Sequence, residues 1–223
     1  MTKDGDAVAL NWAKKNWHRV VVHGVCIATL FILAYYYLFA QLATPIRFVM
    51  LRTGTIGLIL LVASFACTPA ARILHWQGAI QIRRALGLYG FLFTAIHLFA
   101  YAWGDNEFDV ELILRDLDER RAMLIGTIGF ALLIPLALTS TRGWQRRLGR
   151  RWKILHRLVY LALPLAVLHY LLLDRDFIQL PLVFGAVVAI LFLLRITRRL
   201  NLSMRDRTPK ILAFLLQFLL VQH

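Results

Sequence analysis

The stretch that decides the fold is ALGLYGFLFTAIHLFAYAW, residues 85–103, an uncharged and largely apolar run that contains one histidine, His97. A helix needs about 20 mostly apolar residues to cross the hydrocarbon core of a bilayer, so this stretch predicts a membrane span. Five further runs of the same kind lie at residues 20–39, 53–70, 122–139, 154–173 and 177–194. The sequence therefore predicts an all-α integral membrane protein, a six-helix transmembrane bundle.

The composition excludes an ordinary soluble enzyme. The chain has 223 residues, of which 60% are hydrophobic and 17% are charged, whereas a soluble domain is about half apolar and a quarter charged. Its net charge of +14 comes from short basic blocks between the apolar runs, so we expect a lipid bilayer as its partner and no nucleic acid. The two cysteines show no metal-binding or disulfide spacing.

The basic residues predict which side of the membrane each connection faces. Twenty of the 26 Lys and Arg residues lie in the N-terminal segment, the second connection, the fourth connection with the start of the fifth span, and the C-terminal tail. Cytoplasmic loops carry the excess of Lys and Arg, so both termini should be cytoplasmic. We expect a cytoplasmic segment at 1–19, the six-span transmembrane domain at 20–195, and a basic cytoplasmic tail at 196–223 whose apolar end lies at the membrane interface.

The third connection, residues 104–121, carries seven acidic residues and a helical pattern of apolar ones. We predict a short amphipathic helix on the outer surface, which is either a solvated loop or a docking surface for an outside partner. The two halves show no inverted repeat of the transporter type.

Three of the seven histidines lie inside predicted spans, where an ionisable side chain is a functional hypothesis by default. They are His97 in the third span and His156 and His169 in the fifth. At 1.5 Å per residue, His97 and His169 both lie about 20–24 Å from the cytoplasmic side. Two neutral imidazoles on opposite faces of a porphyrin hold a b-type haem that passes single electrons. The four others, His18, His23, His75 and His223, are expected to be interfacial or solvated.

A second haem is an open alternative. His156 precedes His169 by thirteen residues, about 20 Å along a helix, which suits two stacked haems. The same step back from His97 reaches Arg84 instead of a histidine. Either His156 binds an inner iron with a weak or absent partner, or Arg83 and Arg84 pair with haem propionates, or no inner haem exists; the arginines would otherwise be membrane anchors.

Small residues beside the histidines allow two interpretations. Gly90 and Thr94 share a face with His97, and Ala162 and Ala166 share one with His169. They make room for a porphyrin, or they let helices approach each other closely. The basic segment Gly143–His156 also has two interpretations: it binds anionic lipid headgroups, or it contacts flavin phosphates or an acidic electron donor.

Particular motifs carry a family resemblance. They are Thr68-Pro69-Ala70-Ala71-Arg72, Arg83-Arg84-Ala85-Leu86-Gly87-Leu88, Leu138-Thr139-Ser140, the run Leu148-Gly-Arg-Arg-Trp-Lys-Ile-Leu-His-Arg-Leu-Val-Tyr160, and His169-Tyr170. Over residues 50–195 the chain resembles the ferric-reductase-like transmembrane superfamily, and within it the haem-binding subunits of bacterial methionine-sulfoxide reductase systems. The resemblance implies haem ligands at His97, His169 and His156.

The resemblance also implies partners, cofactors and location. Such a subunit sits in the bacterial inner membrane and passes electrons from a quinol or a cytoplasmic flavin reductase to a periplasmic molybdopterin protein that reduces methionine sulfoxide. Members are described as binding haem b and FMN. This chain departs from the family at Leu117–Arg121, which lacks an expected Arg-Pro pair, and beyond Ile196.

Other functions stay open at this point. About 28 residues follow the last span and contain no Gly-rich dinucleotide motif, so we expect an electron-transfer subunit without catalytic residues of its own rather than a complete enzyme. The alternatives are a stand-alone cytochrome b that reduces quinone, ferric iron or oxygen, and a small proton or ion transporter that uses the same histidines.

Overall fold

The computed structural model describes residues 16–173 and 178–196, and every regular element among them is a helix. Six helical segments are long and apolar enough to cross a membrane. They are α2 (Trp17–Leu38), α3 (Pro45–Ile73), α4 (Gly78–Gly104), α6 (Arg121–Leu138), Arg150–Leu173, and the last span Gln179–Ile196. The predicted all-α, six-span fold is confirmed, while the tail segment Ile211–Gln222 lies outside the described residues.

Two spans are longer than the hydropathy pattern predicted. Helix α3 begins at Pro45 instead of residue 53, and α4 begins at Gly78 instead of residue 85. The apolar runs stop at charged residues, but the helices continue through them because long basic side chains can reach the polar interface from a helix end. Proline at the first helical position of α3 also has the φ angle that a helix start requires.

The fifth span consists of three pieces. Helix α8 (Arg150–Leu155) leads into a 3₁₀ turn (His156–Leu158), which leads into α9 (Val159–Leu173). The short helix α7 (Arg142–Leu148) precedes it, and Gly149 joins α7 to α8 with φ +50°, a conformation that glycine adopts without strain. The tighter turn falls on His156, so its side chain leaves the helix at a different angle from that of a continuous α-helix.

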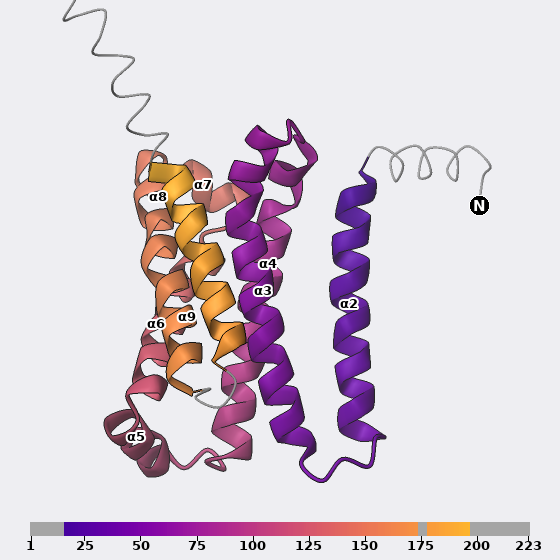
Figure 1. The fold of residues 1–223 in the computed structure, drawn as a ribbon, viewed down its shortest axis with the longest axis vertical. Coiled ribbons are helices and arrows are strands. Elements are labelled where there is room, and N and C mark those ends of the chain that lie inside the picture. The colour runs from indigo at the N-terminus through magenta and orange to yellow at the C-terminus, as the bar shows by residue number, and fades with distance from the viewer. Residues whose placement is uncertain (1–15, 174–177, 197–223) are drawn as a thin grey trace, which may run out of the picture.

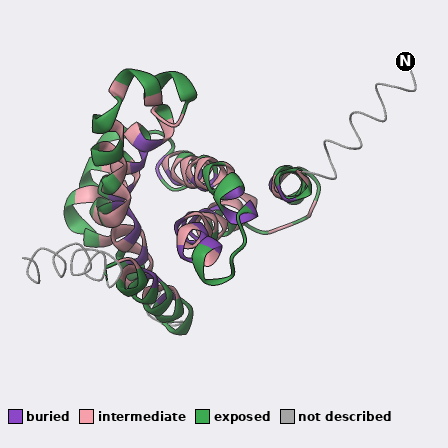
Figure 2. Cartoon of the chain, turned by 90° about the horizontal axis from the view of Figure 1, so that it is seen from above, coloured by how far each residue is buried: buried purple, intermediate pink, exposed green. Residues whose placement is uncertain are grey.

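The spans alternate in direction, so α3 and α6 run one way while α4 and α9 run the other (Figure 1). Seen along the helices, α2 stands to one side of the bundle (Figure 2). The main core joins α3, α6, α9 and the last span around Phe65, Leu133, Leu163 and Val188. Many large apolar side chains are exposed on the outer faces of the spans, among them Phe31, which is 72% exposed. An apolar outer surface is what contact with lipid tails requires.

Glycines bring neighbouring spans close together. A Cβ on Gly57 would lie 2.7 Å from Thr94 Oγ1, and one on Gly90 would lie 3.1 Å from the backbone nitrogen of Leu61. In the second half of the chain, a Cβ on Gly129 would meet Ala162 O at 3.7 Å and Ala166 N at 3.8 Å. The small residues expected to make room for a porphyrin thus lie in helix–helix contacts, where small side chains let backbones approach.

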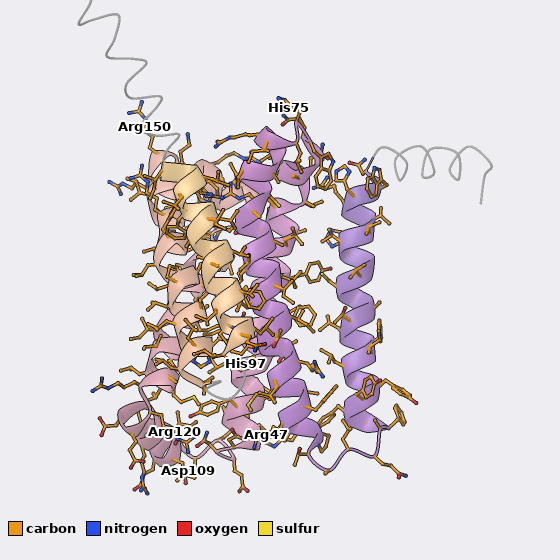
Figure 3. The ribbon with its side chains drawn as sticks, in the orientation of Figure 1. Arg47, His75, His97, Asp109, Arg120 and Arg150 are labelled. Carbon is orange, nitrogen blue, oxygen red and sulfur yellow. The ribbon has the colours of Figure 1, made fainter. Side chains whose placement is uncertain are left out.

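The predicted amphipathic helix of the third connection is confirmed as α5 (Val110–Glu119). Asp109 caps its start, since Asp109 Oδ1 accepts from the backbone nitrogens of Glu111 at 2.8 Å and Leu112 at 3.4 Å. The Tyr101 hydroxyl donates to Asp116 Oδ2 at 2.9 Å and ties α5 to the end of α4. We call the end of the bundle at which α5 lies the α5 end, and the opposite end, at which α8 lies, the α8 end. In Figure 3, Arg47, Asp109 and Arg120 mark the α5 end, and His75 and Arg150 mark the α8 end.

We expect Asp109→Ala to loosen α5. Loss of an N-cap costs about 1 kcal/mol, and a helix of ten residues has little stability of its own. Amide hydrogen exchange in α5, measured on the protein in lipid nanodiscs, should become roughly fivefold faster. Asp118→Ala, an exposed change in the same helix, is the control. Equal exchange rates in the two variants would show that the cap does not hold α5.

Candidate functional site

Two histidines from different spans meet inside the bundle. His97 comes from α4 and His169 from α9, and their ring centres lie 6.1 Å apart with the ring planes at 78°. Both side chains are half-buried. Figure 3 places His97 in the half of the bundle nearer the α5 end. The predicted match in depth between His97 and His169 is therefore confirmed.

A backbone carbonyl holds each of the two rings. His97 Nδ1 lies 2.8 Å from Met50 O on α3, and His169 Nδ1 lies 2.7 Å from Ala122 O on α6. A carbonyl oxygen only accepts hydrogen bonds, so Nδ1 carries the proton in both rings. In the neutral imidazoles the lone pair is then on Nε2. Both histidines are thus held in the tautomer that presents Nε2 as a ligand.

The spacing of the two rings fits one metal ion between them. An imidazole nitrogen binds a metal at about 2 Å, so two imidazoles on opposite sides of one ion have ring centres roughly 6 Å apart. In residues 16–173 and 178–196, no three His, Cys, Asp or Glu side chains group together to hold a metal. The histidine pair therefore offers two ligands, and the remaining positions around the ion would come from a bound group such as a porphyrin.

A repeat in the sequence relates the two histidines, and our sequence analysis missed it. The tetrapeptide Gly-Thr-Ile-Gly occurs at 54–57 and again at 126–129, and each copy precedes its histidine, His97 or His169, by the same distance. Both pairs are 72 residues apart. Helices α3 and α6 run in the same direction, as do α4 and α9 (Figure 1), so this is a direct repeat. An inverted repeat would instead relate spans that run in opposite directions.

His156 is bound differently from the other two. It lies on the 3₁₀ turn at the α8 end, with Nε2 3.2 Å from Thr139 Oγ1. The Thr139 hydroxyl donates its single hydrogen to Pro135 O at 2.6 Å, so it accepts from Nε2–H of His156. The ring of Trp152 lies against the imidazole at 4.0 Å between centres. His156 Nε2 is therefore occupied within the protein.

The arginines at the α8 end have unequal roles. Arg83 Nη1 donates to Thr68 Oγ1 at 3.2 Å, and both Arg83 and Arg84 are exposed. Arg195, which the sequence analysis counted as a basic tail residue, is half-buried in the last span. Its guanidinium donates to Tyr160 Oη at 3.0 Å and to Phe65 O at 2.5 Å, and its central carbon lies 3.7 Å from the centre of the Phe65 ring. It joins the last span to α3 and α9.

Two further histidines join α2 to α4. His18 Nε2 pairs with Gln81 Oε1 at 2.9 Å, and His23 Nδ1 pairs with Tyr89 Oη at 2.9 Å. His18 is not solvated: it is buried near the start of α2, where its pairing with Gln81 satisfies it inside the helix contact. His75 is exposed in the connection between α3 and α4, as expected.

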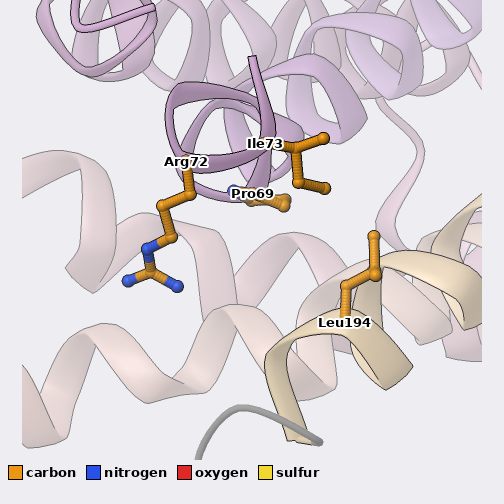
Figure 4. Close-up of a pocket in the computed structure, with 4 residues that line it drawn as sticks. All are labelled: Pro69, Arg72, Ile73 and Leu194. Carbon is orange, nitrogen blue, oxygen red and sulfur yellow. The ribbon is translucent and has the colours of Figure 1, made fainter. Parts of the chain in front are cut away.

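Two surface pockets lie away from the histidine pair. One, of about 370 Å³, lies between the end of α3 and the last span, where Arg72 and Leu194 approach it from opposite sides (Figure 4). The other, of about 500 Å³, lies at the α5 end and is lined by Tyr37, Pro45, Ile46, Trp103, Gly104, Glu107 and Phe108. Neither lining includes His97, His156 or His169.

The hydrogen bonds predict the tautomer of each histidine. In haem-free protein with ¹⁵N-labelled histidine, nitrogen NMR should show the proton on Nδ1 in His97 and His169 but on Nε2 in His156. Single His→Gln variants assign the signals. Thr139→Val should alter the His156 signal and leave the other two unchanged. An unprotonated Nδ1 at His97 or His169 would contradict the proposed contact with the helix carbonyl.

The chain is similar to known membrane proteins over most of its length. The family model described as "Ferric reductase like transmembrane component" matches residues 32–167. A "Protein-methionine-sulfoxide reductase heme-binding subunit MsrQ" from Caulobacter vibrioides is 45% identical over 155 residues, which cover 69% of this chain and 74% of that protein.

Two further proteins of the same name extend the match. The one from Herminiimonas arsenicoxydans is 43% identical over 69% of this chain and 72% of its own length. The one from Rhodospirillum rubrum is 39% identical over 75% of this chain and 81% of its own length. No solved structure matches the chain. The chain therefore belongs to the ferric-reductase-like transmembrane family, and within it to the group that contains these MsrQ proteins.

Proposed function

We propose that this chain is a membrane b-type cytochrome subunit that passes electrons to a periplasmic methionine-sulfoxide reductase. The observation that carries the proposal is the His97–His169 pair, with ring centres 6.1 Å apart. The relatives support it, since they are named as haem-binding subunits of a protein-methionine-sulfoxide reductase. The six apolar spans support a multi-pass location, which we propose is the bacterial inner membrane.

His97 and His169 would hold the haem through Nε2. Iron with two imidazole ligands is low-spin and exchanges single electrons without binding a substrate. The carbonyls of Met50 and Ala122 fix the orientation of the two rings.

The α5 end is the proposed exit for electrons. Gly104 ends α4 seven residues after His97, a distance of about 10 Å along the helix. Beyond it, α5 presents exposed acidic side chains, and the small number of Lys and Arg residues at this end supports an outside location for it. We propose that the partner, a molybdopterin-containing reductase, docks here.

The α8 end is the proposed entry for electrons, from a quinol or from a cytoplasmic flavin reductase. Its exposed cations, among them Arg83, Arg84 and Arg150, are suited to flavin phosphates, including those of FMN, or to an acidic donor. His23 and Tyr89 are hydrogen-bonded between α2 and α4, and such a pair would suit a quinol headgroup. A second haem on His156 would require Nε2 to leave Thr139, so one haem is the simpler proposal. Arg84 lies thirteen residues before His97, about 20 Å along α4, so Arg83 and Arg84 would pair only with the propionates of an inner haem.

We expect His97→Ala and His169→Ala each to abolish the same low-spin b-type haem. The measurement is a reduced-minus-oxidised spectrum of the detergent-purified protein, with pyridine haemochrome quantitation. His156→Ala should keep this haem, and His75→Ala, an exposed histidine, is the matched control. Unchanged haem content and spectrum in His97→Ala would overturn the proposed ligand pair. A folded protein that takes up no haem even with added haemin would overturn the redox function.

Charge reversal at the α5 end should slow electron transfer to the partner. Glu107→Lys with Asp118→Lys removes negative potential from this surface, and complementary charge mainly raises association rates. Reoxidation of the reduced protein by the periplasmic reductase with methionine sulfoxide should slow about tenfold at low salt and less at high salt. Arg150→Glu, at the α8 end (Figure 3), should leave this rate unchanged. An unaltered rate in the α5-end variant would place the docking surface elsewhere.

A further inference from the structure

Two glycines lie directly against the two facing histidines. A Cβ built on Gly54 of α3 would lie 2.8 Å from His97 Nδ1 and 3.1 Å from its Cε1. A Cβ on Gly126 of α6 would lie 2.5 Å from His169 Nδ1 and 2.7 Å from its Cε1. Cβ atoms in proteins essentially never come within 3.0 Å of such neighbours. Any side chain at either glycine would therefore push the imidazole away.

The position of each glycine explains why no larger residue fits. Met50 precedes Gly54 by four residues, and Ala122 precedes Gly126 by four. In an α-helix, a residue lies one turn beyond the residue four positions before it, so each glycine lies next to the carbonyl of Met50 or Ala122. A ring that donates Nδ1–H to that carbonyl must therefore pass beside the Cα of the glycine. Glycine leaves this passage open because it has no Cβ.

The same arrangement occurs twice, and this argues that it has a function. Met50, Gly54 and His97 in the first half correspond to Ala122, Gly126 and His169 in the second, each 72 residues later. The two Nδ1–O distances agree within 0.1 Å, at 2.8 and 2.7 Å. The carbonyl residue differs between the halves, as Met or Ala, whereas the glycine is the same. Both halves thus share one requirement: the histidine ring must be able to pass the glycine and reach the backbone carbonyl.

We propose that Gly54 and Gly126 are positioning residues that hold His97 and His169 as strong iron ligands; this rests on the proposed function of the pair. A hydrogen bond from Nδ1 to a carbonyl fixes the tautomer and ring orientation and raises the basicity of Nε2. A more basic ligand stabilises ferric iron more than ferrous iron. The glycines therefore help to keep the midpoint potential of the haem low, a potential that second-shell hydrogen bonds adjust.

A purely structural role makes a different prediction, and the chain supplies the matched control. Gly57 belongs to the same tetrapeptide as Gly54, and a Cβ there would lie 2.7 Å from Thr94 Oγ1, with no histidine atom among its nearest neighbours. Gly57→Ala thus introduces a comparable clash in the same helix contact. Gly129→Ala is the control for Gly126→Ala, with its nearest neighbour at 3.4 Å.

The experiment compares these four variants with the unmodified full chain in nanodiscs. Haemin titration measures the haem affinity, and spectroelectrochemistry measures the midpoint potential. Gly54→Ala and Gly126→Ala should each weaken haem binding about 10–100-fold. They should also raise the midpoint potential, by about 59 mV for each tenfold loss of preference for ferric iron. Gly57→Ala and Gly129→Ala should keep the original potential. Circular dichroism and gel filtration report folding, and Gly126→Ala provides the result if Gly54→Ala does not fold.

Two outcomes would overturn the proposal, and a third would overturn the proposed function on which it rests. Unchanged haem affinity and potential in the folded Gly54→Ala and Gly126→Ala variants would overturn it. An equal shift in Gly57→Ala would also overturn it, because the effect would then be one of helix packing. If the unmodified protein binds no haem, the proposed function fails instead. Nitrogen NMR of the haem-free protein then still tests positioning, since Gly54→Ala should alter the His97 Nδ1 signal and Gly57→Ala should not.

Discussion

The hydrogen bond from a histidine Nδ1 to a helix carbonyl is the interaction on which the candidate site depends. It occurs at His97 with Met50 and at His169 with Ala122. Each bond joins the two helices of one half, α3 to α4 and α6 to α9, and at the same time sets which ring nitrogen is available as a ligand. In a bilayer an imidazole needs such a partner, since an unpaired polar group in hydrocarbon is costly. Packing and ligand chemistry are therefore satisfied by the same contact.

The direct repeat explains how two such contacts come to face each other. A pair of antiparallel spans with a glycine opposite a histidine is used twice, and the two pairs run in the same direction (Figure 1). When α4 and α9 meet in this arrangement, their histidines arrive at the same level without further adjustment. The site is thus a consequence of the repeated helix pair, with one ligand from each copy. The α8 end departs from the repeat, because His156 in the second half corresponds to Arg84 in the first.

The two ends of the bundle differ in charge and in construction. Acidic residues gather on the capped helix α5, whereas arginines gather around α7, α8 and the start of α4. His97 lies nearer the α5 end, and His156 lies at the α8 end (Figure 3). Arg195 holds the last span to the core by hydrogen bonds to Tyr160 and Phe65. The site therefore sits asymmetrically between two surfaces of opposite charge, an arrangement that suits the proposed transfer of electrons between two partners.

The sequence by itself determined the spans, the amphipathic helix α5 and the common level of His97 and His169. These follow from run length, residue period and helical rise, which are local quantities. It did not determine which residues the small side chains contact: Gly90 and Thr94 pack against α3. Nor did it reveal the bonds of His18 or His156, or the role of Arg195. These depend on which atoms of another helix lie opposite, and only the tertiary structure decides that, because helix rotation and contact distance are set by the packing of all spans together.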